Sequence, residues 1–105
     1  MNLKKVTSEL KKLLIENFQG ESFKIILYGS HARGESNRYS DLDILIIFES
    51  PVDLKKKEKV YELCSDLNIK YSIWIDVSLI SKDEMGTIKG KQPFVQNALS
   101  DGIYI

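Results

Sequence analysis

The sequence predicts one small domain of the α/β (α+β) class, in which helices pack on a small mixed β-sheet. Two observations lead to this prediction. Segments with apolar residues at helical spacing alternate with short runs rich in β-branched and aromatic residues. One of these runs, 41–48, is nearly all apolar after its first three residues, as expected for a strand covered on both faces. The 105 residues suffice for one core, and we find neither repeat nor linker, so we predict a single domain over 1–105.

The first half of the chain is predicted to contain one helix and two strands. Lysines lie opposite an apolar stripe at helical spacing, which is formed by Leu3, Val6, Leu10, Leu13, Leu14 and Phe18. Gly20 follows where this helix is expected to stop. A β-rich run over 23–28 ends at Gly29, and the apolar run over 41–48 forms the second strand.

The second half begins with a predicted helix. Ser50 and Pro51 are typical of a helix start, and Asp53 is placed to support the first turn. Asn68 is expected to end the helix, and a third strand follows over 70–80. The side chains expected to point inward from the helix are Leu54, Tyr61, Leu63, Cys64 and Leu67.

The last quarter of the chain is predicted to be mainly helical. The segment 81–84, with the sequence SKDE, fits a capping box. A final helix leads to Gly102 and a small terminal strand, and its apolar residues are Phe94, Val95, Ala98 and Leu99.

The composition excludes several classes of protein. Fifteen basic residues balance fifteen acidic ones, so we find no electrostatic footprint for DNA or RNA. No apolar run approaches the roughly 20 residues of a membrane-spanning helix, and the N-terminus lacks the pattern of a signal peptide. Cys64 is the only cysteine, which excludes an intrachain disulfide and a thiolate metal cluster. We expect a cytoplasmic protein that binds neither nucleic acid directly nor a membrane.

Three aspartates are candidates for a metal site. Asp41 and Asp43 are two residues apart at the start of a predicted strand, so both carboxylates project from one face. Two like charges beside a core are costly unless a cation neutralises them, and hard oxygen ligands suit Mg²⁺. Asp76 lies on the more polar face of the third predicted strand, together with Trp74. If that strand pairs beside 41–48, three carboxylates converge within reach of two metal ions.

The segment YGSHARG (28–34) is a candidate phosphate site. Gly29 ends a strand and Ser30 begins a turn or short helix, which exposes backbone N–H groups and a hydroxyl to an anion. The segment is neither a Walker P-loop nor a dinucleotide-binding turn, because the residues that define those motifs are missing. Close to a carboxylate pair, such a junction indicates a phosphate bridged to a metal.

Taken together, the stretch GSHARGESNRYSDLD (29–43) resembles the signature of the minimal nucleotidyltransferases of the DNA polymerase β-like superfamily. The positions that match it are Gly29, Ser30, Ala32, Arg33, Gly34, Ser40, Asp41 and Asp43. Asp76 matches the third, strand-borne carboxylate of the family, and 94–105 is similar to its closing segment. The resemblance implies the polymerase β-like nucleotidyltransferase fold.

The resemblance also implies a set of functional residues. Asp41, Asp43 and Asp76 would be catalytic and would bind two Mg²⁺ ions, and Asp76 would help to deprotonate the acceptor hydroxyl. The nucleotide-binding residues would be Gly29 and Ser30, which hold the β- and γ-phosphates of ATP, with Arg33 and Ser40 beside them. Arg33 and Arg38 would neutralise the triphosphate, although an ion pair that holds the loop is an equal alternative for Arg33.

The family reaction is attack of an acceptor hydroxyl on the α-phosphorus, with release of pyrophosphate. Prokaryotic free-standing members are often paired with a HEPN-domain toxin, and they act as antitoxins by transferring AMP to a tyrosine of that toxin. We expect the same protein adenylylation here, with an acceptor that docks from outside the 105 residues, in a homo- or hetero-oligomer. The alternatives are an antitoxin that occludes its partner without catalysis, and nucleotidyl transfer to a small molecule such as an aminoglycoside.

Several side chains near the motifs stay open to two interpretations. We favour a solvated turn position for His31 over an acid–base role, and packing for Trp74 over stacking on a base. Cys64 is expected to be an inert core residue. The pattern decides neither whether Tyr39 covers the nucleotide, nor the base preference, nor the number of nucleotides transferred.

Overall fold

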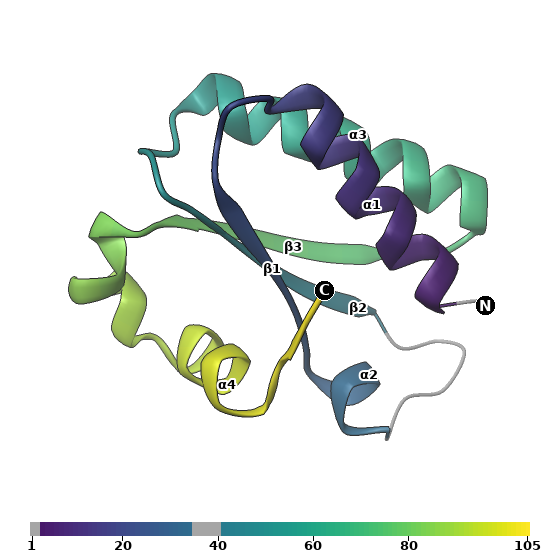
Figure 1. Cartoon of the computed structure of the whole chain (residues 1–105). Coiled ribbons are helices and arrows are strands. Elements are labelled where there is room, and N and C mark those ends of the chain that lie inside the picture. The colour runs from purple at the N-terminus through teal and green to yellow at the C-terminus, as the bar shows by residue number, and fades with distance from the viewer. Residues whose placement is uncertain (1–2, 35–40) are drawn as a thin grey trace.

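In the computed structural model of the chain, residues 3–34 and 41–105 are described, and they form helices on both faces of one sheet (Figure 1). Four strands build the sheet: β1 (Phe23–Tyr28), β2 (Leu42–Phe48), β3 (Ile75–Ser81) and β4 (Ile103–Tyr104). The α-helices are α1 (Leu3–Asn17), α2 (Ser30–Arg33), α3 (Leu54–Tyr71) and α4 (Pro93–Asp101). Two 3₁₀ turns, η1 (Asp83–Gly86) and η2 (Lys89–Lys91), precede α4.

The sheet is mixed, as the sequence predicts. Its strand order is β3-β2-β1-β4, with β2 and β3 parallel and the other two pairings antiparallel. The parallel pair requires a crossover, which α3 provides. α1 and α3 lie together on one face of the sheet, and α4 lies on the other (Figure 1). This arrangement brings the end of β1 and the starts of β2 and β3 to the same end of the sheet.

The core has one layer on each face of the sheet. The larger layer packs α1 and α3 against side chains such as Leu42, Ile44 and Phe48 of β2. The smaller layer lies under α4 and consists of Ile26, Leu45, Ile80, Val95 and Ala98. Because β2 contributes to both layers, its nearly continuous apolar run is explained as predicted.

The junction between α3 and β3 differs from the prediction. The helix does not end at Asn68 but continues to Tyr71, and the strand begins at Ile75 rather than at residue 70. Ser72 closes the helix in the left-handed conformation, at φ 51°. Asn68 instead caps the junction, since its side-chain oxygen accepts a hydrogen bond of 2.8 Å from the backbone N–H of Ile75.

The inward face of α3 was predicted only in part. Leu63, Cys64 and Leu67 are buried as expected, and burial raises the pKa of the Cys64 thiol to about 12, in keeping with an inert core residue. The expectation that Leu54 and Tyr61 point inward is wrong, because they are 70% and 49% exposed. The helix begins after its N-cap Asp53 rather than at Ser50, and its first residue, Leu54, points outward. The Asp53 side chain accepts a hydrogen bond of 2.8 Å from the backbone N–H of Lys56. The residues of this helix that are buried in place of Leu54 and Tyr61 are Lys56 and Val60.

The C-terminal segment agrees with its prediction. Ser81 and Glu84 form the reciprocal hydrogen bonds of a capping box, although the element that they open is the 3₁₀ turn η1.

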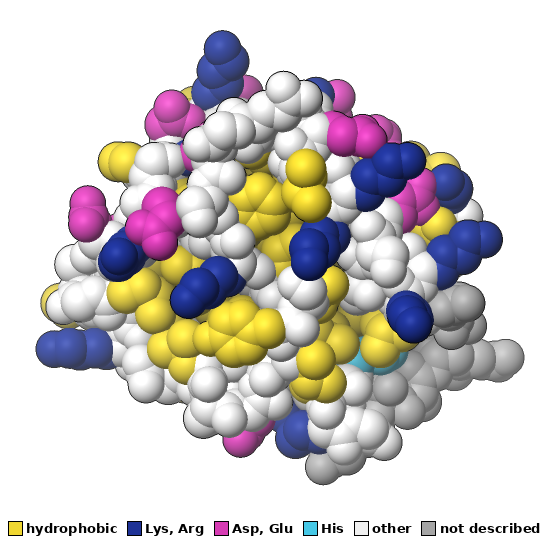
Figure 2. All heavy atoms as spheres, viewed as in Figure 1, with side chains coloured by type: hydrophobic (Ala, Val, Ile, Leu, Met, Phe, Trp, Pro, Cys, Tyr) yellow, Lys and Arg dark blue, Asp and Glu magenta, His cyan; other side chains and the backbone are white. Residues whose placement is uncertain are grey.

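On the face of the molecule in Figure 2, hydrophobic side chains gather over β1, β4 and α4. The exposed members on α4 and β4 are Leu99, Ile103 and Tyr104. In the part of the chain that the structure describes, no helix is both long and apolar enough to cross a membrane.

Candidate active site

The sheet register places the acidic residues in a row across the strands. Asp43 of β2 is paired directly with Asp76 of β3, and Tyr28 of β1 is paired with Asp43 on its other side. These three side chains project from the α4 face, because their neighbours Leu42 and Ile44 belong to the opposite core layer. Asp41, one residue before β2, is exposed. The pairing of β2 with β3, on which the sequence-based prediction of a three-acid site depended, is confirmed.

Gly29 joins the phosphate motif to this acidic row. Its backbone has φ 77° and ψ −154°, which L side chains rarely adopt. A Cβ atom at this position would overlap the Oδ2 atom of Asp43, since the carboxylate lies against the glycine backbone. The segment 29–30 and the carboxylate of Asp43 are therefore direct neighbours in space, although they are more than ten residues apart in the sequence.

The turn that follows is a single helical turn. α2 begins at Ser30, and the N–H of Arg33 donates a hydrogen bond of 3.2 Å to the Gly29 carbonyl. Gly34 ends the turn in the left-handed conformation, at φ 71°. The turn carries His31 and Arg33, whose side chains act to lower the pKa of Asp43.

The electrostatics of the row favour a bound cation. The pKa of Asp43 is raised, first by burial and then by the negative charges of Asp76 and Asp41, against the smaller effects of His31 and Arg33 on α2. The pKa of Tyr28 is also raised, by burial and by the same carboxylates of Asp43 and Asp76, while a hydrogen bond with Ser78 opposes the shift. Carboxylates that raise one another's pKa are stabilised by a cation between them.

The donor set fits Mg²⁺ in its chemistry. Three carboxylates supply the hard oxygen ligands that this ion prefers, and they share one face and one end of the sheet. They are not drawn tightly together, because no three His, Cys, Asp or Glu side chains among residues 3–34 and 41–105 enclose a point where a metal ion would sit. The side chains that would hold the ion are Asp41, Asp43 and Asp76.

The remaining predicted residues differ in outcome. Ser40, together with Arg38 and Tyr39, lies outside the described residues. His31 is partly buried rather than fully solvated, and Arg33 is exposed. The packing role favoured for Trp74 is wrong, because this side chain is 63% exposed. Sequence reasoning missed Tyr28 as part of this face. Its spacing of two residues from Ile26 places both side chains on one face of β1, but the sequence does not show that Tyr28 is paired with Asp43 of β2.

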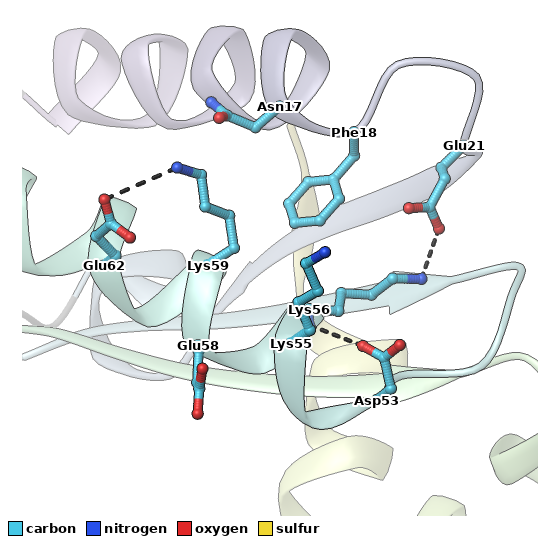
Figure 3. Close-up of a pocket in the computed structure, with 9 residues that line it drawn as sticks. All are labelled: Asn17, Phe18, Glu21, Asp53, Lys55, Lys56, Glu58, Lys59 and Glu62. Carbon is cyan, nitrogen blue, oxygen red and sulfur yellow. Dashed lines mark hydrogen bonds and ion pairs between the residues drawn. The ribbon is translucent and has the colours of Figure 1, made fainter.

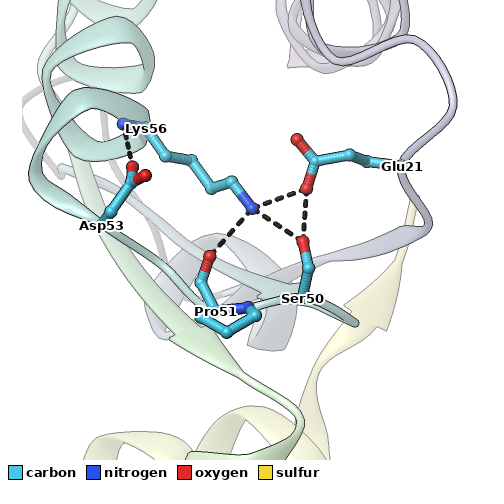
Figure 4. Close-up of polar contacts among 5 residues, drawn as sticks. All are labelled: Glu21, Ser50, Pro51, Asp53 and Lys56. Atoms are coloured by element: carbon cyan, nitrogen blue, oxygen red, sulfur yellow. Dashed lines mark hydrogen bonds and ion pairs between the residues drawn. The ribbon is translucent and has the colours of Figure 1, made fainter.

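A hollow with a volume of 580 Å³ lies elsewhere, between the end of α1 and the start of α3 (Figure 3). Its lining is mainly charged and includes Glu21, Lys56 and Glu62. Lys56 is only 9% exposed, and its ammonium donates hydrogen bonds to Glu21 at 2.5 Å, to Ser50 at 2.9 Å and to the Pro51 carbonyl at 3.0 Å (Figure 4). These contacts tie α3 to the α1–β1 loop, so this cluster of opposite charges has a structural role.

Comparisons with known proteins agree with this geometry. The model of the nucleotidyltransferase domain family matches residues 7–105. A protein of Methanocaldococcus jannaschii, which by its name is assigned as a protein adenylyltransferase, is 34% identical over 102 residues, covering 97% of this chain and 96% of the relative. The crystal structure of a toxin–antitoxin with AMP-PNP has a TM-score of 0.62 at 25% identity, covering 92% of this chain and 69% of that one. A structure described as a minimal nucleotidyltransferase has a TM-score of 0.61 at 24% identity, covering 98% and 95% of the two chains, and shows the same fold.

Proposed function

This chain belongs to the nucleotidyltransferase domain family, and we propose that it transfers AMP from ATP to a hydroxyl group of a partner protein. One observation of the structure carries the proposal most directly. The Gly29 backbone lies against the carboxylate of Asp43, which is itself paired with Asp76, so a phosphate site and an acidic row adjoin. The name of the M. jannaschii relative, a protein adenylyltransferase over nearly the whole chain, supports a protein as acceptor.

In this proposal each group of residues has one role. Asp41, Asp43 and Asp76 hold two Mg²⁺ ions, which supply positive charge that stabilises the triphosphate and the transition state. The segment 29–30 receives the β- and γ-phosphates, since a glycine without a side chain allows close approach to its backbone N–H groups. Arg33 and Ser40 make further contacts with the nucleotide.

The chemical step is a displacement at phosphorus. The oxygen of the acceptor hydroxyl forms a bond to the α-phosphorus, and the bond from that phosphorus to the oxygen bridging the α- and β-phosphates breaks. Pyrophosphate leaves, and AMP remains on the acceptor. Asp76 is exposed on the strand furthest from the phosphate segment, where it can accept the proton of the hydroxyl.

We propose a HEPN toxin as the partner and one of its tyrosines as the acceptor, so that the chain acts as an antitoxin in the cytoplasm. The toxin–antitoxin structure with AMP-PNP, which is 25% identical to this chain, supports a toxin as the partner. We further propose that residues 1–105 act as a single domain in this complex.

The test is transfer of label from ATP to protein. The chain is incubated with α-³²P-ATP, Mg²⁺ and the protein that the neighbouring gene encodes, and label is expected on a tyrosine of a HEPN partner. The double variant Asp41→Ala/Asp43→Ala should abolish the label, whereas Asp66→Ala, which removes an exposed acid of α3, should leave it unchanged. Neutralisation of the toxin that survives the double substitution would instead favour occlusion without catalysis, and label on an aminoglycoside alone would favour a small-molecule acceptor.

A further inference from the structure

The two halves of the site lie on opposite sides of Asp43. The strand order places β1, which ends at the phosphate segment 29–30, on one side of β2, and β3 with Asp76 on the other. In Figure 1, the end of β1 leads into α2, and β3 runs along the other side of β2. A ligand that spans the site from the phosphate segment therefore points toward β3.

Phosphoryl and nucleotidyl displacements place the attacking and leaving oxygens roughly in line, on opposite sides of the phosphorus. With the β- and γ-phosphates on the segment 29–30, the leaving pyrophosphate lies on the β1 side. The attacking hydroxyl must then approach from the β3 side. This direction follows from the strand order together with the proposed function, on which the inference rests.

Trp74 is the large side chain that flanks this approach. It lies two residues before Asp76, and its carbonyl accepts a hydrogen bond of 2.9 Å from the N–H of Leu42, which holds its backbone against β2. Ile73 and Ile75 pack into the layer under α1 and α3, so alternation directs the indole to the face that carries Asp76. The indole is 63% exposed.

We propose that Trp74 recognises the acceptor: its indole forms the platform on which the polypeptide segment bearing the reactive hydroxyl docks. An exposed tryptophan on a fixed backbone presents a large, rigid, partly apolar surface, and such residues dominate the binding energy of protein interfaces. A polypeptide is favoured over the adenine base as occupant, because the indole lies on the β3 side of the site with Asp76, from which the hydroxyl arrives, and not on the β1 side with the phosphate segment.

Kinetics separate acceptor binding from nucleotide binding. With the HEPN partner as acceptor, Trp74→Ala should raise the KM for the partner about tenfold or more, with the KM for ATP within about twofold of wild type. Trp74→Phe should recover most of the loss, because a smaller aromatic ring keeps part of the platform. The matched control is Leu54→Ala, which removes a side chain that is 70% exposed at the start of α3 and should change neither constant. If Trp74→Ala leaves the KM for the partner unchanged, or raises only the KM for ATP, the proposal is overturned.

A second measurement does not depend on catalysis. Trp74 is the only tryptophan of the chain, so incorporation of 5-fluorotryptophan into this chain alone gives one ¹⁹F resonance from the site. We expect the HEPN partner to shift this resonance and AMP-PNP with Mg²⁺ to shift it much less. A shift by AMP-PNP that equals or exceeds that by the partner assigns the indole to the base, and a resonance that the partner leaves in place shows that Trp74 does not contact it; either result overturns the proposal.

The two measurements also distinguish this inference from the proposed function. If the wild-type chain transfers no label but the partner shifts the resonance, the proposed transfer fails and docking on Trp74 stands. If label is transferred at wild-type efficiency by Trp74→Ala, the transfer stands and the role of Trp74 fails.

Discussion

The two ends of the sheet differ in the charges that surround a buried or partly buried ionic side chain. At the end where β2 finishes, Lys56 lies against Glu21, so a cation and an anion neutralise each other (Figure 4). The ammonium of Lys56 also lies over the ring of Phe48, 4.5 Å from its centroid. At the end where β2 begins, Asp43 faces the like charges of Asp76 and Asp41. The ion pair at the first end stabilises the fold, whereas the like charges at the second end lower its stability.

The pKa shifts record this difference in two carboxylates. Hydrogen bonds from Lys56 and Ser50 lower the pKa of Glu21, despite its partial burial. Burial and neighbouring acids raise the pKa of Asp43. The fold therefore stabilises the ionised form of Glu21 and destabilises the ionised form of Asp43.

The largest expected effect comes from Gly29→Ala, which disrupts the acidic end. The new Cβ overlaps the Asp43 carboxylate, so we expect transfer to fall by about 100-fold or more, with a loss of about 1–3 kcal/mol in the free energy of unfolding. Label transfer and urea denaturation measure the two quantities. Gly20→Ala is the matched control: Gly20 also has positive φ, but no atom lies within 4 Å of its Cβ position, so it should lose stability and keep activity. Equal activity losses in both variants would contradict the assignment.

The next effect is at the paired end. Lys56→Met keeps the length of the side chain but removes the ammonium that donates to Glu21 and Ser50. Glu21 keeps the Ser50 hydroxyl as a donor but loses its cation, so we expect a loss of about 2 kcal/mol in the free energy of unfolding. Transfer activity of the folded protein should be unchanged. The control Lys59→Met removes one member of an exposed pair at 3.8 Å from Glu62 and should cost less than about 0.5 kcal/mol. Loss of transfer in folded Lys56→Met protein would show that the two ends are coupled.

An effect of similar size on stability is expected from Mg²⁺ itself. Mg²⁺ that binds only the native state raises the free energy of unfolding by an amount that depends on the ratio of the free Mg²⁺ concentration to the Kd of the site. This amount is about 1–3 kcal/mol for ratios between roughly 10 and 100. We expect Mg²⁺ to raise the midpoint of thermal unfolding of the wild type and of Lys56→Met. It should not raise that of Asp43→Asn. Equal stabilisation of Asp43→Asn would place the ion elsewhere.

The smallest effect is a pH dependence of opposite sign at the two ends, measured without metal. The folded-state pKa of Asp43 lies above its unfolded value, so its ionised form lowers stability at neutral pH, and that cost disappears as the pH falls from the folded to the unfolded pKa. Asp43→Asn should therefore be more stable than wild type at pH 7, with an advantage that vanishes in this acidic range.

Glu21 should behave in the reverse manner. Its pKa is lowered, so its contribution to stability is present above its unfolded pKa and is lost as the pH falls through the folded pKa. Glu21→Gln should be less stable than wild type at pH 7 and should approach it in acid. Urea denaturation of both variants and of the wild type between pH 3 and pH 7 measures these differences in the free energy of unfolding. If the stability of Asp43→Asn relative to wild type increases as the pH falls, the ionised form of Asp43 is not the destabilising one.

Much of the fold follows from local pattern. The strand over 23–28 was predicted to the residue, and 41–48 to within one, because short apolar runs bounded by turn residues have few alternatives. The end of α3 was not, because Asn68 also stabilises a junction that begins three residues later. The sequence also did not predict the burial of Lys56, because its partner Glu21 is 35 residues away in the chain.

The sequence by itself determined the chemistry of the candidate site: the aspartates at positions 41, 43 and 76, the glycine and serine of the turn, and their match to one family. Residue type and short spacing are local properties, so they can be read without the fold. Tertiary structure alone decided which strand lies beside which, and therefore that Asp43 is paired with Asp76, that its carboxylate rests on Gly29, and that Trp74 is exposed next to them. Register and exposure depend on contacts between residues distant in the chain, and no local pattern encodes them.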